Sequence, residues 1–380
     1  MIKEIFKIKF GLLKYDYTRN LGDQIQSIAA NKFLPKVDYF IDRAELNNFY
    51  SDEIVKTILN AWYFHYEGTW PPSNSIDPLI TSIHINLNDE KVINSFISDE
   101  SLEYMKRHGP IGARDISTLN FLKDNNIPSY FSGCLTLTLD KNPNIKKQEY
   151  IVTVDVPEEV INFLKTKTNK RIYNVTHMVP LNMNKPNETR ISLYNSKEKF
   201  TLANSLLDLY QGASSVITNR LHVALPCLAF DTPVLLINNY TYDVDRFVGL
   251  NNLLRNTPLD EYISNYEIFD INNPPENKKD YLKLRNELIN ICKNFTGHIN
   301  NERTKFYPED SNFYISLISN NSKEINKYIT KNNLLYKDKL NEIIKKDKMI
   351  IKQNKKIIKI KLSNSWKFTK PLRLIRNFFK

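Results

Sequence analysis

An arginine and a histidine flank a single leucine in the stretch SSVITNRLHVALPC, residues 214–227. The β-branched run before Arg220 is typical of a buried strand, and the run after it predicts a helix that begins near His222. The first backbone N–H groups of a helix lack partners within it, and cations there oppose the helix dipole. Two potential cations at this turn therefore indicate a bound phosphate or carboxylate. The alternative is a helix capped by Asn219, with both side chains on the surface.

Two other strand-to-helix turns carry polar residues of the same kind. In NLGDQ, Asn20, Gly22 and Asp23 precede a predicted helix, and Gly22 permits close approach of the backbone to an anion. Asp23 also fits as an ordinary helix cap. In GARDISTLNFL, Arg114 ends a short strand, and Asp115 is expected to cap the next helix. The planar fork of Arg114 suits a phosphate or carboxylate, and the alternative is a salt bridge between helices.

Other residues give weaker signals. The stretch NNYTYDVDRF, residues 238–247, follows another predicted strand and offers Tyr240 and Arg246 as ligand contacts. The histidines show no metal-ligand spacing with one another or with cysteine, and His84 is interpreted as a residue on the face of a strand. The sequence contains no GxSxG, P-loop or GxGxxG pattern. We therefore expect neither a metal site nor a cofactor.

The strands and helices that position these turns are predicted to alternate along the chain. Residues 1–140 and 149–320 each contain such an alternation, and the polar, lysine-rich segment 141–148 separates them. Alternation of this kind is typical of βαβ units with parallel sheets. We therefore predict an α/β fold with two Rossmann-like domains facing a cleft, in which SYFSGCLTLTLD, residues 129–140, closes the first domain as a strand or strand pair. Ligands of such folds bind beyond the carboxyl ends of the strands.

Basic charge is concentrated in the last 50 residues. Residues 331–380 hold 16 lysines and arginines against 3 aspartates and glutamates, whereas residues 1–330 hold 37 basic and 39 acidic residues. The nearly neutral body argues against a nucleic-acid-binding protein. Isoleucine pairs repeat every seven residues from 343 to 358, which predicts a basic amphipathic helical tail. We expect this tail to bind an anionic membrane surface, and a coiled coil with a disordered end is the alternative.

The cysteines and the N-terminal residues bear on cellular location. Cys134, Cys227 and Cys292 lie far apart in apolar contexts, as buried free thiols in a reducing compartment would. The N-terminal stretch has no continuous apolar segment typical of a signal peptide, and no apolar run reaches the roughly 18 residues of a membrane-spanning helix. We therefore expect a cytoplasmic protein, held peripherally at the inner face of the plasma membrane by its tail.

Together these motifs resemble those of the polysaccharide pyruvyl transferase family. NLGDQIQ is similar to its Asn-x-Gly-Asp turn, IGARDISTLNFL to its Gly-x-Arg-Asp motif, and GCLTLTL to its Gly-x-x-x-x-Leu strand. VITNRLHVALPCLAFDTPVLLI is similar to its Arg-x-His motif and the strand that follows, although Asp231 replaces the usual glycine of the intervening turn. The resemblance covers residues 10–250. Separately, SNSWKFTKPLR resembles an ending seen on many surface-polysaccharide glycosyltransferases.

The resemblance implies a fold like that of GT-B glycosyltransferases and phosphoenolpyruvate as donor substrate. Two sugar hydroxyls would add to C2 of the donor, phosphate would leave, and a cyclic pyruvate ketal would form on a cell-surface polysaccharide or its lipid-linked precursor. Arg220 and Arg114 would bind the donor, His222 would be the acid, and Asp23 would orient or deprotonate the acceptor hydroxyl. The other expected substrate contacts are Asn20, Gly22, Ser117, Leu221, which spaces its two neighbours, and Arg246.

Two other classes of function stay open from the sequence. A GT-B glycosyltransferase would use a nucleotide sugar, usually with a carboxylate on its ribose, but Asp208 lies inside a predicted helix and Asp231 in a turn. A non-catalytic scaffold would need only the basic tail. The expected partners are phosphoenolpyruvate, a glycan or lipid-linked sugar acceptor and an anionic membrane surface, without nucleic acid. The acceptor sugar and the oligomeric state stay open.

Overall fold

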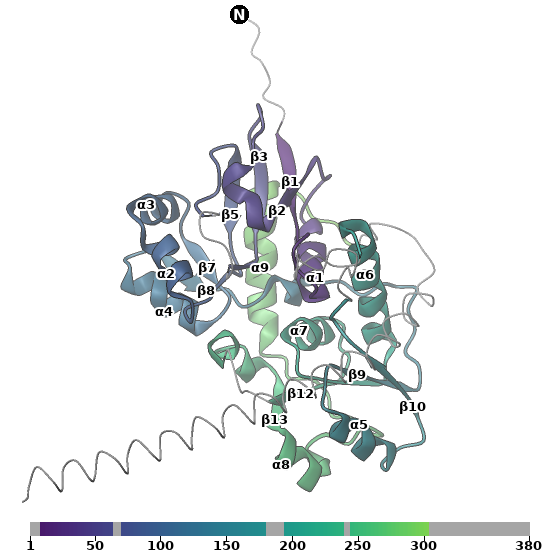
Figure 1. Ribbon diagram of the computed structural model, residues 1–380. Coiled ribbons are helices and arrows are strands. Elements are labelled where there is room, and N and C mark those ends of the chain that lie inside the picture. The colour runs from purple at the N-terminus through teal and green to yellow at the C-terminus, as the bar shows by residue number, and fades with distance from the viewer. Residues whose placement is uncertain (1–7, 64–69, 180–193, 239–243, 304–380) are drawn as a thin grey trace, which may run out of the picture. The chain divides into compact units, whose positions relative to one another are not determined.

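The computed structural model describes residues 8–63, 70–179, 194–238 and 244–303 (Figure 1). The contacts among these residues belong to one compact unit within Met1–Lys323. The division into domains at 1–140 and 149–320 stays a prediction. Tyr240 and the predicted basic tail, residues 331–380, lie outside the described residues.

Four parallel strands form the first sheet, in the order β2-β1-β3-β5 (Figure 1). Two short parallel pairs extend the same half of the chain, β4 with β6 and β7 with β8. The strands are β1 (Lys9–Lys14), β2 (Tyr39–Asp42), β3 (Val55–Leu59), β4 (Trp62–Tyr63), β5 (Ile76–Ile80), β6 (His84–Ile85), β7 (Ile111–Ala113) and β8 (Ser129–Phe131). The expected parallel arrangement is thus confirmed for this half.

The helices of the first half begin at polar caps. Asp89, Ser98 and Asp115 each accept a backbone N–H from the first turn of the helix that follows, which satisfies donors that the helix itself cannot pair. The expected capping role of Asp115 is therefore confirmed. The helices are α1 (Leu21–Asn31), η1 (Arg43–Asn48), α2 (Glu90–Ile97), α3 (Asp99–Arg107) and α4 (Ile116–Asp124).

Five parallel strands form the second sheet, in the order β10-β9-β11-β12-β13. The strands are β9 (Tyr150–Val154), β10 (Arg171–Val175), β11 (Ser215–Thr218), β12 (Val234–Asn238) and β13 (Arg255–Pro258). The helices are α5 (Glu158–Lys165), α6 (Ser196–Gly212), α7 (Leu221–Ala229), η3 (Val244–Phe247), η4 (Asn251–Leu253), α8 (Leu259–Ser264), η5 (Tyr266–Phe269) and α9 (Tyr281–Thr296). Strands and helices alternate as the sequence predicts.

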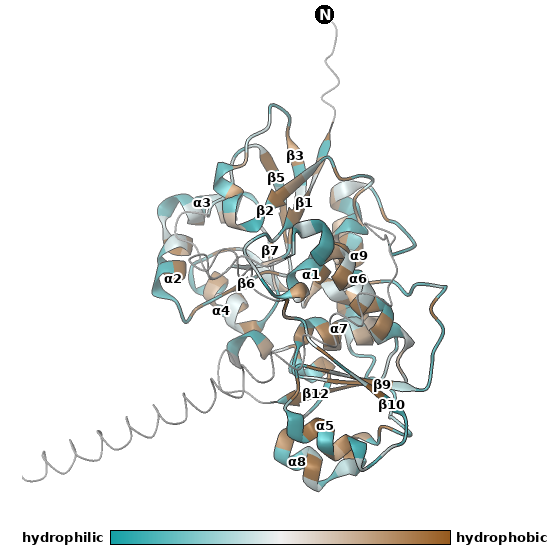
Figure 2. Cartoon of the chain, turned by 45° about the vertical axis from the view of Figure 1, so that its right-hand side comes forward, coloured by the Kyte–Doolittle hydropathy of each residue, from teal (hydrophilic) through white to brown (hydrophobic). Residues whose placement is uncertain are grey.

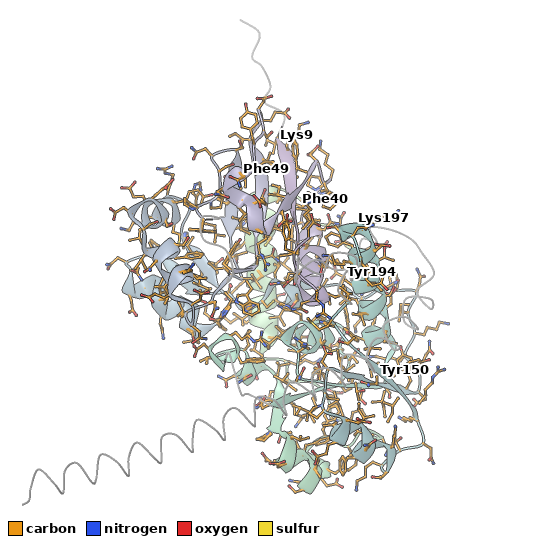
Figure 3. The ribbon with its side chains drawn as sticks, in the orientation of Figure 1. Lys9, Phe40, Phe49, Tyr150, Tyr194 and Lys197 are labelled. Atoms are coloured by element: carbon orange, nitrogen blue, oxygen red, sulfur yellow. The ribbon has the colours of Figure 1, made fainter. Side chains whose placement is uncertain are left out.

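Two helices of the second half, α6 and α9, contact strands of the first sheet. On α6, Leu209 O accepts the hydroxyl of Tyr150 from β9 at 2.9 Å, and Phe200 packs on Phe40 of β2 with ring centroids 6.1 Å apart. Figure 3 labels Tyr150 and Phe40 beside this helix. At the end of α9, Phe295 O accepts a hydrogen bond from Lys56 of β3 at 2.7 Å. The chain thus returns to the first sheet after completing the second.

The order of the strands places a switch point in each sheet. The chain runs from β1 to β2 on one side and then to β3 on the other, so the connections that leave the carboxyl ends of β1 and β3 diverge. The same holds for β9 and β11 in the second sheet. Ligands of open α/β sheets bind at such points, because the connections diverge there and leave a crevice. The turns after these four strands are therefore where a site is expected.

The largest of three clusters of buried apolar residues joins the two halves. The largest cluster combines residues of β1 and α1 with residues of β9, α6 and α7. In Figure 2 the strands β9 and β12 are largely brown, whereas α2, on the outside of the first half, also carries teal. The three cysteines are buried and free, as expected. No helix among the described residues is long and apolar enough to cross a bilayer.

The prediction of a strand or strand pair over 129–140 is only partly right. β8 covers its start, but Leu135–Thr138 form the 3-10 helix η2, and all four residues are buried. This segment packs against α1, α7 and α9. The alternation of leucine and threonine favours a strand, but packing among three helices overrides that local preference.

Candidate functional site

Turns from both sheets line one polar pocket. It receives residues from the turns after β1, β7, β10 and β11, from the first residues of β4 and α7, and from η3. Six of them are residues that the sequence singled out, and Trp62 and His177 are additions. The lining residues are Asn20, Trp62, Arg114, His177, Arg220, Leu221, His222 and Arg246. The pocket therefore lies at the predicted carboxyl ends of the strands and holds three guanidinium groups.

The turn after β1 is tied together by its own polar groups. Asn20 caps α1, because its Oδ1 accepts the N–H of Gly22 at 3.1 Å. A Cβ at Gly22 would lie only 2.8 Å from Nδ1 of His222. Gly22 thus lets the start of α1 pack directly against His222, although it does not line the pocket. Asp23 is buried within the first turn of α1, where its Oδ1 accepts Nε2 of Gln26 at 3.3 Å.

A short stretch after β10 joins this turn to the second sheet. Leu21 donates its N–H to the carbonyl of His177 at 2.8 Å, and Val179 donates its N–H to the carbonyl of Arg19 at 2.9 Å. Asn20 and Met178 form an isolated antiparallel bridge. Backbone hydrogen bonds therefore fix the first-sheet turn relative to the pocket residues of the second sheet.

The turn after β11 places Arg220 and His222 beside the start of α7, as predicted. Arg220 itself occupies the N-cap position, with no side chain capping the helix. The alternative in which Asn219 caps this helix is therefore wrong. The Nε of Arg220 donates to Oδ2 of Asp155 at 2.9 Å, and about a quarter of the Arg220 side chain is exposed. The carboxylate of Asp155 thus supplies part of the negative charge that the sequence predicts beside Arg220.

Arg114 reaches the pocket from the turn between β7 and α4. Its side chain is 3% exposed, and its Nε lies 3.6 Å from Oδ2 of Asp115. Asp115 is also bonded to Nδ1 of His84, at 2.6 Å. Among the described residues, Nε of Arg114 has no hydrogen-bond partner. A buried guanidinium that is incompletely paired suits an anionic ligand.

Arg246 is held against the same pocket from η3. Its guanidinium lies over the ring of Trp62, 5.4 Å from the centroid. Ser117 does not line the pocket, but its Oγ donates to the carbonyl of Asp245 at 3.2 Å and so ties α4 to η3. Ser117 thus supports the segment that carries Arg246, which differs from the substrate contact expected from the resemblance.

The electrostatics of the pocket keep His222 neutral. Burial lowers the pKa of His222 well below its ordinary value, and the positive charges of Arg114, Arg246 and Arg220 act in the same direction. Its Nε2 atom is buried and has no hydrogen-bond partner among the described residues. A dianionic ligand would offset the arginine charges, so binding of such a ligand favours protonation of His222.

Four residues around the pocket were missed or undervalued from the sequence. Asp155 follows the β-branched strand β9, and a carboxylate at that position was a usable signal. Trp62 follows β3, and His84 was interpreted only as a strand residue, although it bonds Asp115. His177 carries no local signal, because only the chain path after β10 brings it to the other turns.

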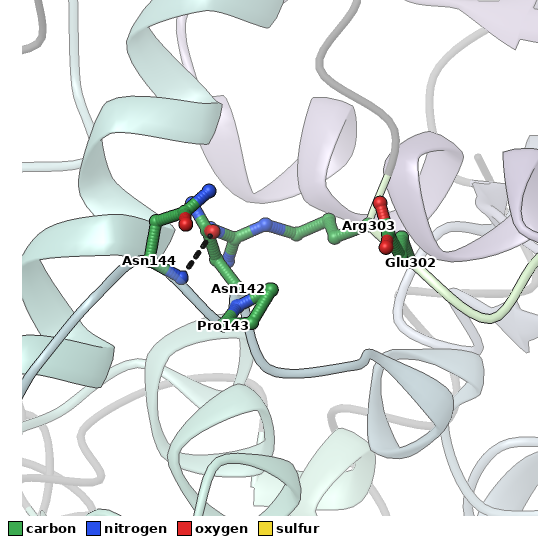
Figure 4. Close-up of a pocket in the computed structure, with 5 residues that line it drawn as sticks. All are labelled: Asn142, Pro143, Asn144, Glu302 and Arg303. Atoms are coloured by element: carbon green, nitrogen blue, oxygen red, sulfur yellow. Dashed lines mark hydrogen bonds between the residues drawn. The ribbon is translucent and has the colours of Figure 1, made fainter.

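A second pocket, of about 280 Å³, lies where residues 142–144 meet the last described residues (Figure 4). Its walls include Asn142, Asn144 and Arg303. Arg303 is paired with the buried Asp208 of α6, so its charge is already neutralised within the protein. Among the described residues this pocket contains none of those that the sequence singled out. We interpret it as a packing feature of the segment that joins the two halves.

An α/β protein with parallel sheets and a cationic pocket at the strand ends defines a class that handles small anionic ligands. The sequence profile of the polysaccharide pyruvyl transferase family matches residues 20–240. Because this match covers more than half of the chain, the protein belongs to the polysaccharide pyruvyl transferase family and is a transferase of polysaccharide biosynthesis. The resemblance seen in its motifs is thereby confirmed.

Comparison with curated protein sequences finds no match. Among solved structures, a functionally uncharacterised protein of Klebsiella pneumoniae is similar at 14% identity, over 63% of this chain and 87% of that chain, with a TM-score of 0.38. The UDP-GlcNAc 2-epimerase of Methanocaldococcus jannaschii is 11% identical over 75% and 99% of the two chains, with a TM-score of 0.36. The UDP-N-acetylglucosamine 2-epimerase of Rickettsia bellii is 12% identical over 88% and 98%, with a TM-score of 0.32. Similarity this low says nothing about the chemistry of the pocket.

Proposed function

We propose that the protein transfers the pyruvyl group of phosphoenolpyruvate to a sugar of a cell-surface polysaccharide or its lipid-linked precursor. The observation that carries this proposal is the pocket in which Arg114, Arg220 and Arg246 surround His222. Phosphoenolpyruvate bears a phosphate and a carboxylate on the same carbon, so two guanidinium forks bind both ends of it. The donor is a substrate, and the reaction needs no further cofactor.

Arg220 and Arg114 are the proposed donor clamp. Arg220 is partly exposed, with its Nε held by Asp155 at 2.9 Å, so its terminal nitrogens are available to a phosphate. Arg114 is buried at the opposite turn, which suits the smaller carboxylate. Arg246, above Trp62, adds positive charge at the rim. Because these arginines come from separate turns, the clamp depends on how both halves pack.

The reaction then balances without other reactants. A sugar hydroxyl oxygen bonds to C2 of the donor and gives up its proton, while C3 takes up one proton and becomes a methyl group, so this addition is neutral in protons. The second hydroxyl oxygen replaces the phosphate at C2 and its proton leaves with the phosphate, so the products are a cyclic ketal and inorganic phosphate. His222 is the proposed acid for C3 or for the departing phosphate.

The low pKa of His222 makes this role depend on the donor. In the free protein burial and the arginine charges keep the imidazole neutral. The negative charges of phosphoenolpyruvate offset those arginines, so binding should be accompanied by proton uptake at His222. His222 would therefore carry the proton that it donates only when the donor is bound.

The acceptor hydroxyl needs a group that orients it or takes its proton. The resemblance implies Asp23 in this role, but its carboxylate is buried inside the first turn of α1 and does not line the pocket. Asn20 does line the pocket, with its Oδ1 committed to the N–H of Gly22. Asn20 is therefore the better candidate on α1 for orienting a sugar hydroxyl, through its amide NH₂ group.

The test combines donor binding with turnover. Titration of phosphoenolpyruvate into the full-length protein, in buffers of different ionisation enthalpy, should show binding with about one proton taken up. Surface glycan freed of ketals by mild acid should then give inorganic phosphate and a pyruvate ketal detectable by mass spectrometry. Release of a nucleoside diphosphate from a nucleotide sugar, without either of these products, would instead establish the glycosyltransferase alternative.

Variants separate the chemistry from folding. His222→Ala should reduce turnover by about 1,000-fold while leaving the melting temperature nearly unchanged, because a general acid contributes rate rather than packing. Arg220→Lys should weaken donor binding, since a point charge does not reproduce the guanidinium fork. His298→Ala, at a histidine that bonds Asn300 outside the pocket, is the matched control and should stay active. Full activity of His222→Ala would contradict its assignment.

We further propose that residues 331–380 hold the enzyme at an anionic membrane surface, where a lipid-linked acceptor would be found. Support comes from the sequence alone, with 16 basic residues against 3 acidic ones in this segment. Pelleting with anionic vesicles should be lost when 331–380 is deleted, with turnover of a soluble acceptor retained. Continued pelleting of the truncated protein would contradict the tether.

A further inference from the structure

Asp155 stands at the carboxyl end of β9 in a backbone conformation that L-residues rarely adopt. Its φ is +54°, in the left-handed region, and it comes directly after Val154. Glycine is the usual residue in this region, and aspartate is one of the few others that tolerate it. Strained positions of this kind persist where the surrounding structure holds them, and they cluster at functional sites.

The carboxylate of Asp155 connects two residues that line the pocket. Its Oδ2 accepts Nε of Arg220 at 2.9 Å and the backbone N–H of His177 at 3.1 Å. The Asp155 side chain is 1% exposed, whereas that of Arg220 is 25% exposed. One buried oxygen thus joins the turns after β9, β10 and β11 at the switch point of the second sheet.

The geometry of this bond determines which part of Arg220 remains for a ligand. Nε is the donor nearest the side-chain stem, so a bond there sets the plane of the guanidinium and leaves the terminal nitrogens to bind outward. Oδ1 of Asp155 is buried without a hydrogen-bond partner among the described residues. An unpaired buried carboxylate oxygen is costly, so the residue is poorly explained by stability alone.

We propose that Asp155 is a positioning residue for donor binding, which orients the guanidinium of Arg220 from a strained turn after β9. It does not touch the donor and takes part in no bond-making step. This inference rests on the proposed function, because it assigns Arg220 to phosphoenolpyruvate. Its consequence is specific: loss of the carboxylate should weaken the donor site and leave the acceptor site and the fold unaffected.

The chain provides a matched control for the strained backbone. Asp231, in the turn before β12, also has a positive φ, of +52°, and its exposed carboxylate pairs with Lys141 and Lys279. It does not line the pocket. Replacing either aspartate by glycine relieves the same backbone conformation, but only the change at Asp155 removes a bond to Arg220.

The test is steady-state kinetics of the full-length variants with phosphoenolpyruvate and ketal-free surface glycan, with melting temperatures measured alongside. Asp155→Gly should raise the KM for phosphoenolpyruvate by about 10- to 100-fold, as expected for a lost hydrogen bond to a charged group, with the acceptor KM unchanged. Its melting temperature should fall only modestly, because glycine adopts this φ freely and this offsets part of the cost of the two lost hydrogen bonds. Asp155→Asn should restore the donor KM to within about fivefold, since an amide oxygen still accepts both bonds. Asp231→Gly should leave both KM values unchanged.

The outcomes separate this inference from the proposed function. An unchanged donor KM in Asp155→Gly, in an enzyme that turns over phosphoenolpyruvate, would overturn the positioning role alone. Equal increases in donor and acceptor KM, with a large fall in melting temperature, would indicate a structural role and also overturn it. A wild-type protein that neither binds nor converts phosphoenolpyruvate would overturn the proposed function and, with it, the inference.

Discussion

The turn after β1 and the turns of the second sheet use similar residues in different ways. In the first-sheet turn, residues 15–23, Asn20 caps α1 and Asp23 is bonded to Gln26. In the second-sheet turns, Arg220 relies on Asp155 alone, and Nε2 of His222 has no partner among the described residues. Both kinds of turn thus contribute to the pocket, but Asn20 and Asp23 are paired within the first turn of α1, whereas His222 keeps a buried nitrogen without a partner.

A buried lysine pairs with backbone carbonyl groups of the first-sheet turn. Lys199 of α6 donates to the carbonyl oxygens of Tyr15, Asp16 and Thr18, at 2.6, 3.1 and 3.1 Å. Burial lowers the pKa of its ammonium group to about 8, against the opposing charge of nearby carboxylates such as Asp16. Backbone carbonyl groups of the first-sheet turn are thus paired within the protein, although Oη of Tyr15 has no partner among the described residues.

The strongest test of this comparison is Gly22→Ala, which changes the contact between the two kinds of turn. An added Cβ would lie 2.8 Å from Nδ1 of His222 and 3.1 Å from Oδ1 of Asn20, so the imidazole must move. We expect kcat/KM to fall by about 100-fold, because a small displacement of a reacting group is costly. Steady-state kinetics measures this effect.

A double-mutant cycle with His222→Ala identifies the cause. In that background the clash with the imidazole is gone, while the Cβ of residue 222 and Oδ1 of Asn20 stay 3.1 Å from the added Cβ, so Gly22→Ala should destabilise the protein less in urea unfolding than it does with His222 present. Equal destabilisation in both backgrounds would show that the first-sheet turn does not support His222.

The second test uses pH, because His177 of the second-sheet turns is buried and neutral. Burial lowers its pKa to about 3, whereas an unfolded histidine titrates near 6.5. Between these values the unfolded chain binds more protons, so the free energy of unfolding rises with pH from about 3 to 6.5 and this contribution is complete above that. We expect His177→Gln to remove up to about 1.4 kcal/mol per pH unit from the slope.

Urea unfolding at several pH values between 4 and 8 measures that slope. Tyr210→Phe removes the hydroxyl that lies 2.7 Å from Nε2 of His177 but keeps the imidazole. This control should therefore retain the wild-type slope. An unchanged slope in His177→Gln would mean that the histidine is accessible to protons in the folded protein.

The smallest effect is expected from Asp23→Asn. Asp23 is buried on α1 and lies outside the pocket, so the variant should lose about 1 kcal/mol of stability from the helix N-terminus. Its kcat/KM for the acceptor, measured at saturating phosphoenolpyruvate, should stay within about threefold of wild type. A 100-fold loss of activity with full stability would return Asp23 to the role of acceptor base and weaken the contrast between the turns.

Local sequence patterns predict much of this architecture. The β-branched run that forms β11, the apolar run that forms α7 and the capping residue Asp115 all act through nearest neighbours, so their patterns predict them. Local patterns fail at Leu135–Thr138. The alternation of leucine and threonine there favours a strand, but three surrounding helices hold the segment in a 3-10 helix. Site residues behave likewise: Arg220 and His222 were visible locally, whereas His177 was not.

The sequence by itself indicated which turns carry the polar residues of the pocket, because residue type and helix position already predicted an anion beside Arg220 and His222. It also determined the family, through motifs that the profile match over residues 20–240 confirms. Only the tertiary structure decided that Asp155 pairs with Arg220 and that Gly22 packs on His222. These pairs are distant in sequence, and the order of strands in each sheet, which no local pattern encodes, brings them together.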